Sequence, residues 1–209
     1  APITLTPPTS TSDATWTFES SDPLIATING SNLEVKKVGK VTITAKQNET
    51  DTFLASSKSF EVVVNPATPV LGASAPIVKN FSLSPSKIVA PTSNSNGVWS
   101  YQISDSSIAA IVDGNLVMKK AGITSLIATQ AATADYLGTQ VQIALQVNPV
   151  ISATAAKRVI TIKVRGVSAK VYINGKKAKV GKNTVTAGKK TVRVLVSGKE
   201  IYKKAFTIK

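Results

Sequence analysis

The chain has 209 residues and a formal net charge of +14, because 25 Lys and Arg residues outnumber 11 Asp and Glu residues. It contains no Cys, which excludes disulfides and thiolate metal sites, and no His, the commonest general base and metal ligand near neutral pH. Its apolar runs are strand-sized and far shorter than a membrane-spanning helix requires. The 43% apolar content is that of a globular chain rather than a disordered one.

An internal repeat with a period of 83 residues organises most of the chain. Residues 1–66 align without a gap with residues 84–149, and 23 of the 66 aligned positions are identical. The sequence therefore predicts a duplicated domain followed by a third, unrelated one. We refer to the three predicted domains as repeat 1 (residues 1–66), repeat 2 (residues 67–149) and the basic module (residues 150–209).

Apolar and polar residues alternate within each repeat, with the period of half-buried strands. Leu33 and Val35 show this alternation, as do the runs 41–45 and 60–64. Turn residues separate the runs at positions where a hairpin needs a positive φ, namely Asn29-Gly30, Gly39, Asp113-Gly114 and Gly122. Short strands between frequent turns predict an all-β fold of tandem immunoglobulin-like sandwiches.

Two segments of the repeats carry a family pattern. Residues 16–28 read Trp-Thr-Phe-Glu-Ser-Ser-Asp-Pro-Leu-Ile-Ala-Thr-Ile, residues 39–45 read Gly-Lys-Val-Thr-Ile-Thr-Ala, and residues 99–129 hold the counterparts. An aromatic residue followed by Ser-Ser-Asp, Ile-Ala-(Thr)-Ile, a Gly turn, a Lys-rich arm and Gly-x-x-x-Ile-x-Ala resembles the group 2 bacterial immunoglobulin-like family. The resemblance implies stalk or adhesive modules of bacterial surface proteins and phage virions.

Repeat 2 begins with a segment that has no counterpart before repeat 1. Residues 67–83 contain the strand-like Pro69-Val70-Leu71 and Phe81-Ser82-Leu83. Repeat 1 is therefore expected to lack its opening strand. One explanation is that the chain is a piece of a longer repeat array, cut inside a repeat. The other is that a neighbouring subunit supplies the strand, because an open sandwich edge invites β-augmentation.

The composition changes abruptly after Asn148-Pro149. Residues 1–150 carry 9 Lys and Arg residues against 10 acids, whereas residues 151–209 carry 16 Lys and Arg residues and one acid, Glu200. The basicity of the whole chain therefore belongs to the basic module. Apolar residues again alternate there, and Asn174-Gly175 suits a type I′ hairpin turn, so we expect a small β-sandwich.

The second half of the basic module resembles a PEGA-type surface domain. The resemblance rests on Val171-Tyr172-Ile173-Asn174-Gly175 and on the later Ala187-Gly188-Lys189-Lys190-Thr191-Val192-Arg193-Val194, within residues 169–209. The loop between them is rich in Lys and lacks the prolines usual in that family. The resemblance implies a surface β-domain.

The alternation also predicts which side chains of the basic module face outward. Seven apolar positions are expected to face inward: Ile160, Ile162, Val164, Val171, Ile173, Val192 and Val194. Positions of opposite parity then project together on one outer face: Lys163, Arg165, Lys170, Tyr172 and Arg193. Loop lysines extend the positive field: Lys176, Lys177, Lys179, Lys182, Lys189 and Lys190. We expect these residues to contact an anionic surface polymer or an acidic partner, the alternative being that they only protect edges and keep the surface soluble.

Patterns for catalysis and metal binding do not stand out. The acids are scattered, no nucleophile motif has a base beside it, and no phosphate-binding loop occurs. Calcium at the loops of Asp51 or Asp135 is a weak alternative. Trp16 and Trp99 are expected to pack in the cores rather than to stack on carbohydrate. We therefore expect no enzyme activity and no cofactor.

The sequence thus predicts a non-catalytic extracellular, cell-surface or virion protein, a modular stalk whose basic end attaches to an anionic surface or an acidic partner. Two alternatives stay open: a self-assembling filament or sheath subunit completed by strand exchange, and the accessory stalk of a larger surface enzyme. Other subunits, or further repeats of the same array, are the expected protein partners. Nucleic acid is not favoured, because only Tyr172 and Tyr202 could stack on bases.

Overall fold

The computed structural model of the protein describes residues 2–209, and Ala1 lies outside the described residues. All regular structure in residues 2–209 is β-strand, arranged in six sheets, so the predicted all-β fold is confirmed. This part of the chain contains no helix that could cross a membrane. Residues 2–70 form one compact unit together with residues 94–97 and 131–139, and the rest of the described chain forms a second unit.

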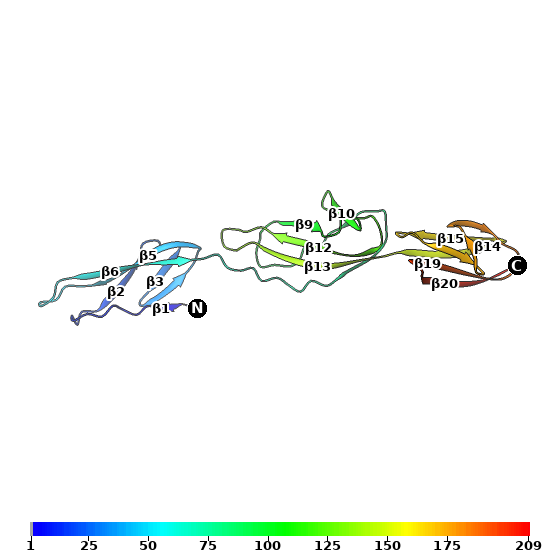
Figure 1. Ribbon diagram of the computed structural model, residues 1–209. Coiled ribbons are helices and arrows are strands. Elements are labelled where there is room, and N and C mark those ends of the chain that lie inside the picture. Colours follow the sequence, from blue (N-terminus) through cyan, green and yellow to red (C-terminus); the bar gives the residue numbers. More distant parts are fainter. Residues whose placement is uncertain (1) are drawn as a thin grey trace. The chain divides into compact units, whose positions relative to one another are not determined.

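Repeat 1 forms two sheets. Its strands are β1 (Ile3–Thr4), β2 (Trp16–Ser20), β3 (Ala26–Asn29), β4 (Asn32–Val35), β5 (Gly39–Gln47) and β6 (Ser56–Val64). One sheet has the order β1-β4-β3 and the other has the order β2-β5-β6. The long strand β5 lies between β2 and β6 and pairs antiparallel with both (Figure 1).

Repeat 2 has the same strands and one more. Its strands are β7 (Ile77–Asn80), β8 (Ser86–Lys87), β9 (Trp99–Ile103), β10 (Ala109–Val112), β11 (Asn115–Met118), β12 (Gly122–Gln130) and β13 (Thr139–Asn148). The sheets have the orders β10-β11-β8 and β7-β13-β12-β9. The additional strand β7 pairs parallel with β13, the counterpart of β6.

The registers of the two repeats agree residue for residue. Ile3 lies opposite Leu33 in repeat 1, and Ser86 lies opposite Leu116 in repeat 2, with both partners displaced by 83 positions. The sequence duplication is therefore a duplication of structure. Strand β7 is the difference between the two sheets, and the described residues of repeat 1 hold no counterpart of it, as the sequence predicted. The strand itself lies at Ile77–Asn80, so the prediction that 69–71 and 81–83 are the strand-like runs of this segment is wrong.

Glycines have two different roles in the repeats. The predicted positive φ is present at Gly30 (61°), Gly39 (153°), Asp113 (47°) and Gly114 (72°). The prediction is wrong for Asn29 and Gly122, whose φ values are not in this range. A Cβ at Gly122 would lie 2.8 Å from Cδ1 of Ile108, and one at Gly39 would lie 2.7 Å from Cδ1 of Ile25. Both glycines therefore allow the start of a strand to approach an isoleucine closely.

The core of each repeat lies between its two sheets. In repeat 1 the buried cluster is Ala26, Leu33, Val41 and Ile43. In repeat 2 it is Ile108, Ala109, Leu116, Met118, Leu145 and Val147. Strand β13 thus contributes two fully buried side chains to its core, whereas β6 contributes none. Trp16 and Trp99 are half-buried and belong to neither cluster, which differs from the core packing that the sequence indicated.

A buried glutamine ends the central strand of each repeat. The Nε2 of Gln47 donates to the carbonyl oxygen of Ala14 at 2.5 Å, and its Oε1 accepts from Oγ of Ser10 at 2.7 Å. Gln130 likewise accepts from Oγ of Ser93 at 2.8 Å. Buried amides of this kind need such partners, so the glutamines fix the loop that precedes β2 and β9.

The basic module forms a third sandwich. Its strands are β14 (Val150–Ala156), β15 (Val159–Arg165), β16 (Lys170–Ile173), β17 (Lys176–Ala178), β18 (Gly181–Thr184), β19 (Gly188–Val196) and β20 (Lys199–Ile208). The sheets have the orders β14-β15-β18 and β17-β16-β19-β20. The predicted hairpin turn is confirmed, because Asn174 and Gly175 have φ values of 49° and 78°, both positive as a type I′ turn requires.

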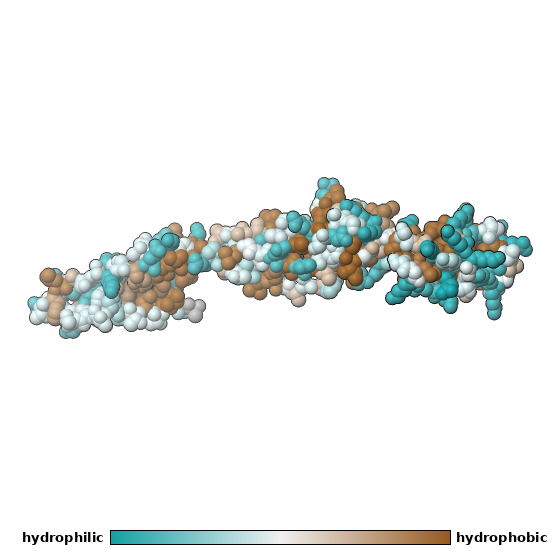
Figure 2. Space-filling model, viewed as in Figure 1, coloured by the Kyte–Doolittle hydropathy of each residue, from teal (hydrophilic) through white to brown (hydrophobic). Residues whose placement is uncertain are grey.

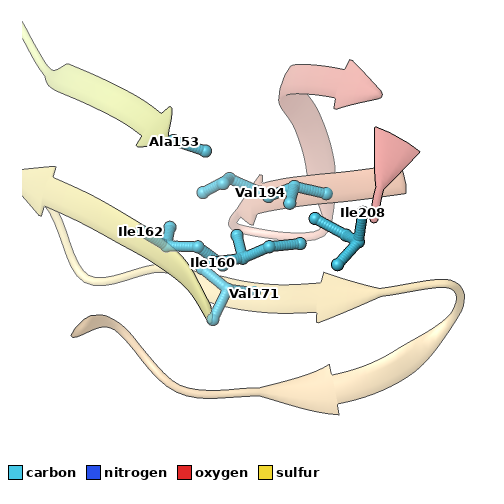
Figure 3. Close-up of a cluster of buried hydrophobic side chains, with 7 residues drawn as sticks. Ala153, Ile160, Ile162, Val171, Val194 and Ile208 are labelled. Carbon is cyan, nitrogen blue, oxygen red and sulfur yellow. The ribbon is translucent and has the colours of Figure 1, made fainter. Parts of the chain in front are cut away.

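The core of the basic module draws on both of its sheets. The buried side chains are Ala153, Ile160, Ile162, Val171, Val192, Val194 and Ile208. Figure 3 shows these side chains converging between the strands. The seven positions predicted to face inward all pack in or against this cluster. The hydroxyl of Tyr202 joins the layers by accepting from the backbone N–H of Ala153 at 3.0 Å.

Candidate anion-binding surface

The cations of the basic module lie on two outer faces that point away from each other. Because both sheets turn one face toward the shared core, alternate residues on each strand project from the opposite face. Figure 2 shows the hydrophilic side chains of this module gathered over the strands labelled β14, β15, β19 and β20 in Figure 1. The charge is therefore carried by regular strands as well as by loops.

Four side chains form a row across the outer face of the four-stranded sheet. Tyr172 lies opposite Lys177 on one neighbouring strand and opposite Arg193 on the other, and Arg193 lies opposite Lys203. Directly opposed residues have Cβ atoms about 5 Å apart. We call Lys177, Tyr172, Arg193 and Lys203 the basic row. It presents three cations and one aromatic ring on a backbone fixed by the sheet.

The neighbourhood of the basic row is almost wholly positive. Lys170 precedes Tyr172 by two residues on β16, and Lys189 precedes Arg193 by four on β19, so alternation places both on the same face. Glu200, the single acid of the module, forms an ion pair with Arg193. This pair offsets the charge in the middle of the row. Within residues 2–209 neither Lys177 nor Lys203 forms an ion pair, so the ends of the row keep their charge exposed.

Lys163 and Arg165 do not share this face, and the prediction of one common outer face is wrong. Both residues lie on β15, which belongs to the three-stranded sheet. Lys182 lies on that sheet too, opposite Thr161. Alternation in the sequence shows which side chains point away from a core, but it does not show which of two sheets holds a strand. The candidate contacts on the strands are therefore divided between opposite surfaces.

The remaining loop lysines lie at the margins. Lys176 lies opposite Ile173 at the end of the β16–β17 hairpin, so it is on the face of the sheet that turns toward the core. The Nζ of Lys190 donates to Oγ1 of Thr186 at 3.1 Å and to the carbonyl oxygen of Ala187 at 3.2 Å. Lys179 is held through its backbone, which exchanges hydrogen bonds with the side chain of Asn183.

Sequence reasoning missed Lys203. The signal was present, because Tyr202, Phe206 and Ile208 all face the core and so place residue 203 on the outer face. The register with Arg193 completes the row, and it could not be derived from the sequence.

One pocket with apolar side chains in its lining lies in repeat 2. It has a volume of about 310 Å³ and is lined by Leu116, Leu126 and Ile143, with residues from 73–79 and 86–92 at its mouth. Its charged lining residues are lysines, and no acid lines it.

Two titrating groups outside the basic module have shifted pKa values. The hydroxyl and the backbone N–H of Ser107 donate to Asp105 and lower the pKa of its carboxyl, and burial raises the pKa of Tyr101. Neither residue lines the pocket in repeat 2. In residues 2–209 no group of three or more His, Cys, Asp or Glu side chains is arranged to hold a metal ion.

No family model and no curated protein match the chain. Solved structures do resemble it. Surface layer protein SbsC, domains 4–9, is 14% identical over 92% of this chain and 38% of its own, with a TM-score of 0.31. Drosophila N-cadherin EC1–3 is 10% identical over 99% of this chain and 90% of its own, with a TM-score of 0.37. Mouse protocadherin-24 EC1–3 is 11% identical over 99% and 91%, with a TM-score of 0.31.

This chain spans less than two fifths of the SbsC fragment that it resembles. At identities of 10–14% and TM-scores of 0.31–0.37 this likeness decides neither the fold nor the function. The all-β architecture is established by the strand pairing of the chain itself.

Proposed function

We propose that the protein is a non-catalytic structural or adhesive protein of a cell surface or a virion, and that the basic row attaches it to a phosphate-bearing polymer. The observation that carries the proposal is the in-register alignment of Lys177, Tyr172, Arg193 and Lys203 on one rigid outer face. The two repeats then serve as spacers with immunoglobulin-like sandwiches.

The physics of a polymeric anion supports this assignment. A charged polymer meets several fixed cations at once and releases counterions as each one binds, so modest single contacts add up. Exposed charges are screened over about 8 Å at physiological ionic strength. Binding should therefore weaken steeply as salt rises. The ring of Tyr172 adds an apolar surface between the cations, which suits the carbon backbone of a polymer.

The family resemblances agree with a surface role. The group 2 immunoglobulin-like pattern of the repeats and the PEGA-like pattern of the basic module both imply proteins outside the cytoplasm. We propose the domain boundaries 1–66, 67–149 and 150–209 from the 83-residue repeat and from the change of composition after Asn148-Pro149. Partners of this kind would be further repeats or other subunits of the same surface assembly.

The test compares two double variants of the full chain that remove equal charge. K177Q/K203Q neutralises the ends of the basic row, and K163Q/R165Q neutralises two cations on the opposite face. Binding to immobilised poly(glycerol phosphate) is measured from low to physiological salt. At about 1 kcal/mol for each cation near an anionic surface, K177Q/K203Q should bind about 30-fold more weakly.

The control variant should lose much less. Equal losses in both variants would mean that net charge, not the basic row, drives binding. A wild-type chain that fails to bind at low salt would contradict attachment by this module altogether. Neutral dextran provides the baseline for the immobilised surface.

A further inference from the structure

Strand β6 in repeat 1 has an unpaired outer edge, whereas the same edge of its counterpart β13 in repeat 2 is covered by β7. In the sheet β2-β5-β6, strand β6 pairs on one side only, with β5. In the sheet β7-β13-β12-β9, its counterpart β13 pairs on both sides. Within residues 2–209 no other strand pairs with β6. An unpaired edge of nine residues is a template for another strand.

The apolar side chains of β6 are exposed where those of β13 are buried. Phe60 is 42% exposed, whereas Ile143 at the same position of repeat 2 is 6% exposed. Val62 is half-buried, whereas Leu145 is fully buried. Figure 2 shows apolar side chains on the visible surface of repeat 1. The duplicated sequence has therefore kept an inward apolar face on β6 that its own fold does not fully bury.

Repeat 2 shows what covers such an edge. Strand β7 runs parallel to β13, with Ile77 opposite Leu145 and Asn80 opposite Asn148. The side chains of Ile77 and Phe81 pack against the core of repeat 2. The backbone N–H of Phe81 donates to the carbonyl oxygen of Asn148 at 2.8 Å and continues the pairing beyond the strand.

We propose that the edge of β6 binds an extended segment in the same way. The occupant runs parallel to β6 with an apolar residue opposite Val62 and with a second apolar residue just past Asn65. Its inward side chains follow the pattern of the segment Ile77–Phe81, in which an isoleucine and a phenylalanine are four residues apart. Backbone hydrogen bonds supply affinity, and the inward pair supplies selectivity.

The occupant comes from outside these 209 residues. The chain has two edges of this kind, at β6 and β13, and a single segment, 77–81, that fits them. A second copy that donated its β7 would open its own repeat 2, so the exchange would bury no additional surface. The donor is therefore the lead-in segment of a further repeat outside these residues, and it carries the Ile77–Phe81 pattern that repeat 2 uses on itself.

The first experiment uses the tryptophans as separate reporters. Trp16 lies in repeat 1 and Trp99 in repeat 2, and the chain has no others. The probe is a peptide with the sequence of residues 72–83, and the matched control peptide carries Ser at the positions of Ile77 and Phe81. The probe should raise the denaturant concentration at the midpoint of repeat 1 unfolding, as reported by Trp16 fluorescence in the full-length W99F variant. It should leave the unfolding midpoint of repeat 2, as reported by Trp99 in the W16F variant, unchanged. The reason is that the tethered β7 outcompetes free peptide for the edge of β13.

The second experiment tests direction and register. The chain has no Cys, so N65C introduces a unique thiol at the position equivalent to Asn148. Asn148 lies opposite Asn80. Probe peptide carrying Cys in place of Asn80 should form a disulfide with N65C under mild oxidation. Probe peptide carrying Cys in place of Ala73, at the other end, should cross-link at least tenfold less.

Each outcome decides the proposal. A midpoint that does not move at millimolar peptide, or that the control peptide raises equally, overturns strand docking. Preferential cross-linking through Cys at position 73 overturns the parallel register. Reversible dimerisation of the full chain that is lost in the I77S variant would make a second copy the occupant and overturn an outside donor.

Discussion

Repeat 1 and repeat 2 are one fold in two states of completion. Their strand orders and registers match at a spacing of 83 residues, yet Leu145 is buried completely and its counterpart Val62 is not. The hairpins that build each sheet are local, whereas β7 must find β13 across more than fifty intervening residues. The comparison teaches that the antiparallel sheets form without the parallel strand, and that this distant strand completes the core.

The largest expected effect is a gap in stability between the repeats. Packing Ile77 and Phe81 against the core, at about 2 kcal/mol each, should make repeat 2 about 4 kcal/mol more stable than repeat 1. Denaturant unfolding of the W99F and W16F variants reports each repeat separately. The fluorescence of Trp16 should therefore change at a clearly lower denaturant concentration than that of Trp99. Coincident transitions would show either that the repeats unfold together or that β7 contributes little.

The next largest effect is the loss of this stability difference when repeat 2 is destabilised by a substitution in β7. A carboxylate at position 77 would face Leu145 and the core, so I77D should destabilise repeat 2 by about 3 kcal/mol and bring it close to repeat 1. V78D is the matched control, because Val78 is 57% exposed and should tolerate the same change within about 0.5 kcal/mol. Trp99 fluorescence in a W16F background gives both values. Similar losses in the two variants would mean that charge on β7, and not the buried contact, is responsible.

Most of the fold could be predicted from the sequence. The period of 83 residues gave the duplication, and the alternation of apolar residues gave the seven inward positions of the basic module. The missing strand was visible in the alignment because residues 67–83 have no counterpart. Gly122 was assigned to a turn although it serves close packing, since a glycine looks the same in sequence for either purpose.

The candidate surface could be predicted only in part. The concentration of charge after residue 150 was plain from composition. Its distribution over two faces depended on sheet membership, because Lys163 and Arg165 lie on a different sheet from Tyr172. The register of β19 with β20 then placed Lys203 beside Arg193. Partition between sheets is set by which strands pair with one another. That pairing is a long-range property that alternation within one strand does not encode.

The smallest expected effect concerns one turn in which the repeats differ. Asp22 accepts from the backbone N–H of Leu24 at 2.9 Å, whereas Asp105 accepts from the N–H of Ser107 at 2.9 Å and also from its hydroxyl at 2.5 Å. These bonds lower the pKa of Asp105. A carboxyl whose pKa is lower in the folded state stabilises the fold above its unfolded pKa, and this contribution is lost as pH falls through the folded pKa. S107A should therefore raise the pKa of Asp105 in a carboxyl NMR titration and flatten the acid dependence of repeat 2, whereas S106A should change neither. An unchanged Asp105 titration in S107A would show that the backbone bond alone stabilises the carboxylate.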